Sequence, residues 1–169
     1  MKALLLLLAL ALSSISLACG TNRFEAELET ERAAIKLAQE TVRGGYRLIS
    51  TDEVKALLDS DKGIVLVDAM PAGASFDKGH IAGAVNFEFP KETLESWDAE
   101  QIKGGSKEDY AKLLGSDTSR TIVTYCGFVE CARSHNAAVF ARELGFTDVR
   151  RFPGGIHAWR GGGYSLTTD

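Results

Sequence analysis

The chain has 169 residues, of which 45% are hydrophobic and 25% are charged, and its formal net charge is −4. This length suits one globular domain with accessory segments rather than several domains. The sequence contains no cluster of lysines and arginines, so it lacks the basic surface typical of nucleic-acid-binding proteins, and we expect no nucleic-acid partner.

The N-terminus has the pattern of a secretory signal. Lys2 precedes an apolar run, residues 3–12, that is too short to cross a bilayer, and small residues lead up to Cys19. We therefore predict a signal peptide at residues 1–18 and export of the mature chain to the periplasmic side. The stretch SLAC resembles the bacterial lipoprotein box, so Cys19 is the expected lipid attachment site and the only membrane contact. The alternative is ordinary cleavage and a plain periplasmic protein.

Residues 22–43 are predicted to form a helix. Asn22 and Glu25 have the spacing of a capping box, apolar residues recur on one stripe, and two glycines follow at residues 44–45. We treat residues 19–45 as an N-terminal tether and residues 46–169 as the domain. The helix either lifts the domain off a membrane or packs on the outside of the domain, and we favour packing.

Strand and helix patterns alternate after this segment. The expected strands are residues 46–49, 63–70, 84–87, 120–126 and 148–152. The expected helices begin at Ser50, cover residues 91–97 and 106–114, follow residue 134 to Leu144, and end with a short helix through Trp159. Alternation of this kind favours a single α/β domain with a parallel sheet of about five strands and helices on both faces.

Cys126 ends the most apolar of these strands, and ligands in such folds bind just beyond the carboxyl ends of strands. Where a strand turns into a helix, unpaired backbone N–H groups and the positive end of the helix favour an anion. We therefore expect Cys126 to have a lowered pKa and to act as a nucleophile. The other residues of this loop and anion cradle are Gly127, Phe128, Val129, Glu130, Cys131, Ala132, Arg133 and Ser134.

Three loop side chains have specific expected effects. Arg133 can fork two hydrogen bonds to an oxyanion, and the Ser134 hydroxyl can cap the following helix or donate into the cradle. Glu130 adds a negative charge, which opposes thiolate formation and repels multiply charged anions. A small sulfur donor therefore suits this loop better than phosphate.

Several stretches, in order, resemble the rhodanese-like family of sulfurtransferases. They are VLVDAMPAGASFDKGHIAGAVNF from residue 65, IVTYC from residue 122, SHNAAVFARELGF from residue 134 and RRFPGGIHAWRGGGY from residue 150. The resemblance covers about residues 46–166. It implies that Cys126 takes a sulfane sulfur from a small donor such as thiosulfate, holds it as a persulfide and passes it to a thiophilic acceptor, without a cofactor.

The sequence departs from the family pattern at three places. The family's arginine two residues after the strand aspartate is missing, because Ala69 and Met70 follow Asp68. Six residues separate Cys126 from Arg133, whereas the common single-domain loop has four. Cys131 is an additional cysteine, either a resolving thiol that attacks a Cys126 persulfide, a disulfide partner, or a small apolar residue.

The remaining polar candidates are assigned supporting roles. Asp68, at a strand end, is expected to cap nearby N–H groups, and His80 is expected to be a structural hydrogen-bonding residue rather than a base. No histidine has companions at metal-ligand spacing, so we predict no metal. The alternative functions are a catalytically inactive rhodanese-like binding module and, ranked last, a phosphatase or arsenate reductase, which needs five residues between cysteine and arginine. The oligomeric state stays open.

Overall fold

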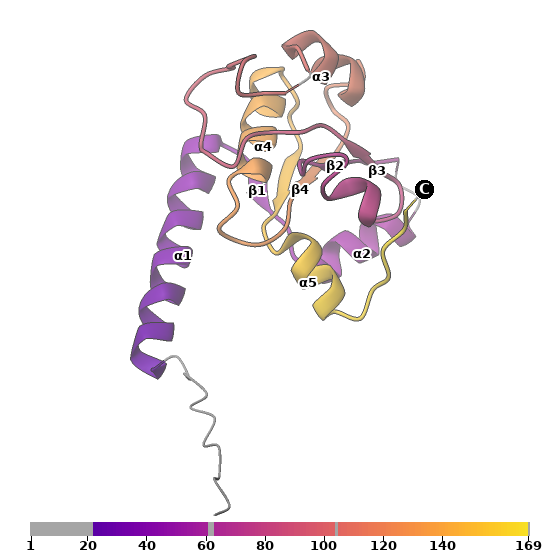
Figure 1. Ribbon diagram of the computed structural model, residues 1–169. Helices are drawn as coiled ribbons and strands as arrows, with labels where there is room; N and C mark the ends of the chain where they lie inside the picture. Colours follow the sequence, from indigo (N-terminus) through magenta and orange to yellow (C-terminus); the bar gives the residue numbers. More distant parts are fainter. Residues whose placement is uncertain (1–21, 61–62, 104, 169) are drawn as a thin grey trace, which may run out of the picture.

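A five-stranded parallel sheet forms the centre of the protein (Figure 1). The computed structural model describes residues 22–60, 63–103 and 105–168. The sheet order is β1-β5-β4-β2-β3, and every pairing is parallel. The strands are β1 (Arg47–Leu48), β2 (Val65–Asp68), β3 (Ala84–Asn86), β4 (Ile122–Tyr125) and β5 (Val149–Phe152).

Helices cover both faces of the sheet. One core cluster joins Ile122 of β4 to α3 (Lys107–Leu114) and α4 (Arg133–Glu143), and the other joins Val123 to α2 (Thr51–Asp59) and α5 (Gly155–Gly161). Neighbouring residues of a strand point to opposite faces, so β4 is buried on both sides. The predicted single α/β domain with a parallel sheet of five strands and helices on both faces is confirmed.

Several helices begin at the residues where local sequence signals predicted a helix start. Ser50 and Glu53 form a reciprocal capping box at α2, and Ser106 and Asp109 form another at α3. At α1 (Arg23–Gly44), the Asn22 side chain accepts a hydrogen bond from the N–H of Phe24. These caps satisfy backbone donors that a helix start leaves unpaired. A short 3-10 helix, η1 (Phe76–Lys78), was not expected from the sequence.

The N-terminal helix α1 packs along α4 and extends beyond the domain at its first turns (Figure 1). Its apolar stripe does not make this contact, because Phe24, Leu28, Ile35 and Val42 are exposed. The buried residues of α1 are Glu40 and Gly44. The helix is therefore attached to the domain by polar contacts on its other side.

Residues 91–97 do not form the helix that their polar pattern suggested. The Asn136 side chain of α4 takes the backbone groups that a helix would use, since its amide nitrogen donates to the carbonyls of Pro90 and Glu92 and its oxygen accepts from the N–H of Leu94. The segment is irregular, with bends and no helix, and Trp97 packs against Tyr110 and Phe140.

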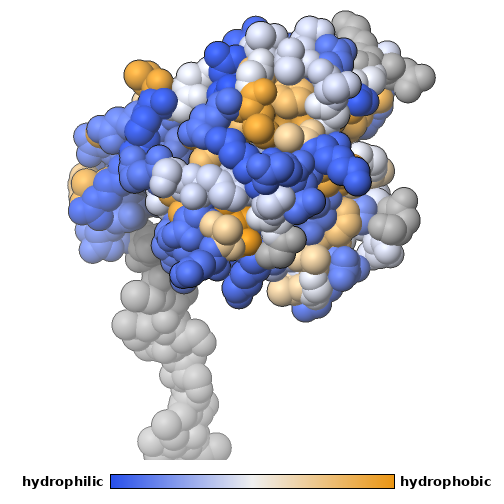
Figure 2. Space-filling model, turned by 90° about the horizontal axis from the view of Figure 1, so that it is seen from above, coloured by the Kyte–Doolittle hydropathy of each residue, from blue (hydrophilic) through white to orange (hydrophobic). Residues whose placement is uncertain are grey.

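The surface seen in Figure 2 carries small hydrophobic patches separated by hydrophilic residues. Within the described ranges, no helix is both long and apolar enough to span a membrane. The predicted signal peptide and Cys19 lie outside the described residues, so export and lipidation stay predictions.

Candidate active site

The loop that follows β4 lies against the start of α5. The N–H groups of Ile156 and His157 donate to the carbonyls of Cys126 and Gly127, each at 3.0 Å. Gly155 has a φ of +51°, and a Cβ at this position would overlap the carbonyl oxygen of Cys126. Only glycine adopts this conformation without strain while letting the two backbones approach this closely. The closing glycine motif therefore fixes the first residues of the loop.

The Cys126 sulfur is buried, with backbone carbonyls and the hydroxyl and N–H group of Ser134 beside it. Its thiol lies 3.3 Å from the carbonyl oxygen of Cys131 and 3.2 Å from Oγ of Ser134. Burial, followed by the hydrogen bond and charge of the neighbouring Cys131 thiol, raises the pKa of Cys126 well above its usual range. The expectation of a lowered pKa at Cys126 is therefore wrong, because burial outweighs the hydrogen bonds that the hydroxyl and the N–H group of Ser134 make to this sulfur.

Cys131 has the opposite environment. Its side chain is partly exposed, and its sulfur accepts hydrogen bonds from the Cys126 thiol and from the N–H groups of Arg133 and Gly127. The bond from Cys126 is the largest contribution that lowers the pKa of Cys131, to about 6, and the backbone donors and the Arg133 charge add to it. Two loop N–H groups therefore face the partly exposed Cys131 sulfur, and its pKa is shifted in the direction opposite to that of the buried Cys126.

Arg151 of β5 is a site residue that the sequence reading missed. Its side chain is fully buried, and its guanidinium donates to the carbonyls of Val129 (3.2 Å) and Cys131 (2.9 Å) and to Oγ of Ser134 (3.0 Å). On its other side it pairs with Glu40 of α1 at 2.5 Å. The sequence did contain a signal for this role, because Arg151 lies inside a strand that is covered on both faces. A charge in such a place needs buried partners.

Arg133, the arginine expected in the cradle, points elsewhere. Its guanidinium donates to the carbonyl of Phe89 at 2.6 Å, and it lines a surface pocket together with Pro90 and Lys91. Two cations from other elements bind the loop carbonyls instead. Lys36 of α1 donates to the carbonyl of Glu130 at 2.7 Å, and Arg151 donates to the carbonyls of the neighbouring residues Val129 and Cys131.

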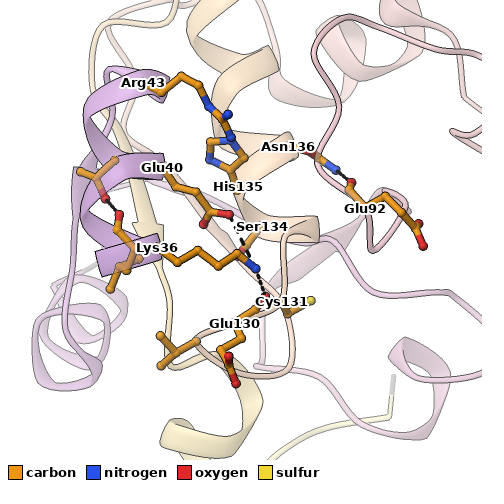
Figure 3. Close-up of polar contacts among 12 residues, drawn as sticks. Lys36, Glu40, Arg43, Glu92, Glu130, Cys131, Ser134, His135 and Asn136 are labelled. Atoms are coloured by element: carbon orange, nitrogen blue, oxygen red, sulfur yellow. Dashed lines mark hydrogen bonds and ion pairs between the residues drawn. The ribbon is translucent and has the colours of Figure 1, made fainter. Parts of the chain in front are cut away.

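The other loop side chains are divided between the interior and the surface. Ser134 is buried and bonds to Arg151 and Cys126, and its side chain does not cap α4. Figure 3 shows the Glu130 carboxylate directed away from the Cys131 sulfur. Phe128 and Val129 are 47% and 38% exposed, and Phe128 stacks on the ring of His157. Two exposed apolar side chains therefore form the outer rim of the loop, with Ala132 buried beneath it.

Asp68 and His80 support the strand ends next to the loop. The Asp68 carboxylate accepts from the N–H of Met70 at 2.8 Å, as expected of a capping residue, and burial raises its pKa. The His80 ring stacks on Phe76, and its Nδ1 lies 3.0 Å from the carbonyl of Phe76. Met70, at the position where the family has arginine, packs beside Gly127. An apolar thioether therefore replaces a cation at this edge of the site.

Within the described part of the chain, no group of three or more His, Cys, Asp or Glu side chains is placed to hold a metal ion. The chemistry that these residues can perform is that of two adjacent thiols. One thiol is buried and protonated, and the other is partly exposed and ionises readily.

Two curated proteins named as thiosulfate sulfurtransferases are similar to this chain. Thiosulfate sulfurtransferase GlpE of Shewanella oneidensis is 29% identical over 115 residues, which cover 68% of this chain and 92% of that protein. A Saccharopolyspora erythraea protein with the provisional name thiosulfate sulfurtransferase is 26% identical over 125 residues, or 72% of this chain, but the match spans only 43% of that relative. These distant relatives support a sulfurtransferase-family function.

Solved structures show the same fold at low identity. A rhodanese-like domain from Anabaena has a TM-score of 0.52 at 21% identity, with coverage of 72% of this chain and 79% of that chain. The polysulfide-sulfur transferase homodimer of Wolinella succinogenes has a TM-score of 0.53 at 18% identity, with coverage of 79% and 88%. The profile of the rhodanese-like domain family matches residues 50–161, more than half of the chain, and on this match the chain belongs to the rhodanese-like domain family.

Proposed function

We propose that this protein is a sulfurtransferase that moves a sulfane sulfur from a small donor such as thiosulfate to a thiophilic acceptor. The sulfur rests as a persulfide on Cys126, the residue at the carboxyl end of β4. The reaction needs no cofactor, because a thiolate displaces sulfite from thiosulfate and the acceptor then attacks the outer sulfur of the persulfide.

The observation that carries this proposal is the contact between the two loop thiols. The Cys126 and Cys131 side chains are close enough to shift each other's pKa, and the N–H groups of Gly127 and Arg133 point at Cys131. A pair of thiols with one ionised member near neutral pH is suited to nucleophilic attack on a sulfur atom.

The test is turnover of thiosulfate and cyanide to thiocyanate and sulfite by the purified mature protein. The matched baseline is a double variant, Cys126→Ser with Cys131→Ser, which keeps hydroxyl donors in place of both thiols. We expect the wild type to form thiocyanate well above this baseline. Equal rates in the two proteins would overturn the proposal.

A catalytically inactive binding module is the second candidate, and one observation favours it. Cys126 is 0% exposed, so a donor in solution has no direct path to its sulfur. Intact-mass measurement without reductant separates the two functions. The binding module is expected to take up no sulfur from thiosulfate, or to be fully crosslinked between Cys126 and Cys131 in the native protein.

We also propose that residues 1–18 direct export and that Cys19 carries a lipid that anchors the domain on the periplasmic side of a membrane. The SLAC stretch supports this assignment. Expression in a bacterial host followed by fractionation tests it. The wild type is expected in the membrane fraction and a Cys19→Ser variant in the soluble periplasmic fraction. Membrane association that is unchanged by the substitution would rule out the lipid anchor.

A further inference from the structure

The two cysteines of the loop differ in what a donor molecule can reach. The Cys126 sulfur is buried beneath the Cys131 carbonyl and Ser134, whereas the Cys131 side chain is partly exposed. Displacement at sulfur needs direct contact between the attacking sulfur and the sulfur of the donor. A molecule such as thiosulfate therefore meets Cys131 before it meets Cys126.

The charges around the two sulfurs also favour Cys131 as the residue that first reacts with an anionic sulfur donor. The Cys126 sulfur has two carbonyl oxygens beside it as well as the Ser134 donors, whereas the less buried Cys131 sulfur faces the N–H groups of Gly127 and Arg133. Arg151 and Lys36 donate to the carbonyls of Cys131 and Glu130, so two positive charges lie beside this part of the loop. The site thus favours negative charge at the second cysteine more than at the buried first one.

We propose that Cys131 is the catalytic residue that attacks the sulfur donor, and that it then hands the sulfane sulfur to Cys126. This inference rests on the proposed sulfurtransferase function and assigns the entry step within it. In that step the Cys131 thiolate attacks the outer sulfur of thiosulfate, a new S–S bond forms, the S–S bond of the donor breaks and sulfite leaves. The product is a Cys131 persulfide anion, so charge and atoms balance.

The second step moves the sulfur inward. The proton of the Cys126 thiol passes to the outer sulfur of the Cys131 persulfide, the Cys126 thiolate attacks that same sulfur, and Cys131 leaves as a thiolate. The Cys126 thiol lies 3.3 Å from the carbonyl of Cys131, and the two side chains shift each other's pKa, so the groups for this exchange are neighbours. A thiolate of low pKa is the better leaving group and a thiol of high pKa the better resting place, so the difference between the two cysteines drives sulfur toward Cys126.

Glu130 makes this order measurable, because it separates the two cysteines in the sequence. The protein is mixed with thiosulfate, quenched over time with an alkylating reagent and cleaved after glutamate, so that Cys126 and Cys131 fall in different peptides. In the wild type we expect the sulfur first on the Cys131 peptide and later on the Cys126 peptide. The Cys126→Ser variant should still load Cys131 and keep the sulfur there, because the residue that would receive it is missing.

The Cys131→Ser variant should load Cys126 roughly tenfold or more slowly than the wild type. Loading of Cys126 at the wild-type rate in this variant, or sulfur on the Cys126 peptide first in the wild type, would overturn the relay while the sulfurtransferase function stands. If the variant fails to fold, the order of labelling in the wild type still decides. A wild type that takes up no sulfur on either cysteine would overturn the function itself, and the relay with it.

Discussion

At the scale of single residues, Arg151 holds the loop in place. Its buried guanidinium pairs with Glu40 and donates to the carbonyls of Val129 and Cys131. Those bonds turn the loop so that its N–H groups face the Cys131 sulfur. A charge at this depth is stable only while each of its partners is present, so the loop and the ion pair depend on each other.

Replacement of Arg151 by methionine is therefore expected to cost about 3–5 kcal/mol of unfolding free energy, because Glu40 is left buried without its counter-ion. Urea unfolding followed by circular dichroism measures the change. Arg150→Met on the same strand is the matched control, since its pair with Asp148 is partly exposed and is worth about 1 kcal/mol or less. A double variant, Glu40→Leu with Arg151→Met, should recover much of the loss. Equal effects of the two single substitutions would contradict the role of the buried pair.

The chemistry at this scale was only partly predictable. The place of Cys126 at a strand end follows from the apolar run before it, and the presence of Cys131 is plain in the sequence. Which sulfur meets the N–H groups depends on how nine loop residues fold, and that fold depends on contacts with Arg151 and Lys36, far away in the chain. No local sequence pattern shows these contacts. The lowered pKa was therefore expected at Cys126, whereas the structure lowers the pKa of Cys131.

At the scale of elements, α1 belongs to the site although it precedes the segment that matches the family, residues 50–161. Lys36 donates to the Glu130 carbonyl (Figure 3). Glu40 forms an ion pair with Arg151. The helix was expected to pack on the outside of the domain, and it does so through these polar residues. The sequence showed the stripe of α1 but not which side of the helix faces α4.

Replacement of Lys36 by alanine should loosen the loop without unfolding the domain. Its side chain is 44% exposed, so we expect a stability loss of about 1 kcal/mol or less, reduced by solvent screening. Amide hydrogen exchange at residues 129–131 should become faster. Arg32→Ala, one turn earlier and paired only within α1 by its contact with Glu29, is the matched control. Unchanged exchange in the Lys36 variant would show that α1 does not restrain the loop.

The strands and most helices were predictable because their signals are local. Capping boxes at Ser50 and Ser106 and apolar runs of strand length each lie within a few residues of the element that they define. The helix predicted at residues 91–97 does not form for the opposite reason, since Asn136 holds the backbone of this segment from a helix that is distant in the sequence. Long-range side-chain bonds to the backbone override a polar helical pattern, and such partners are not visible along the chain.

At the scale of the whole molecule, stability is linked to pH through His135. This buried histidine lies among Arg43, Arg151 and Lys36, with Glu40 as the opposing charge. Burial is the largest cause that lowers the pKa of His135 from 6.5 to about 4, and the cations add to it. Between these two pKa values, His135 therefore binds a proton in the unfolded chain but not in the folded protein. Stability is fully present above about pH 6.5 and falls until about pH 4.

The expected loss from this one group is roughly 3 kcal/mol across that window. Urea unfolding of the wild type and of His135→Gln at several pH values measures it, and the variant should lose stability less steeply on acidification. His157→Gln, at an exposed position, is the control and should keep the slope of the wild type. Identical slopes in the wild type and the His135 variant would contradict the assignment.

The most direct test of the whole account is the intact mass of the reduced, mature protein before and after incubation with thiosulfate. We predict that the wild type gains the mass of one sulfur atom and loses it again on addition of cyanide. The double variant, Cys126→Ser with Cys131→Ser, should gain nothing. A wild type whose mass does not change, or a double variant that gains the same mass, would contradict the claim that this loop carries sulfur.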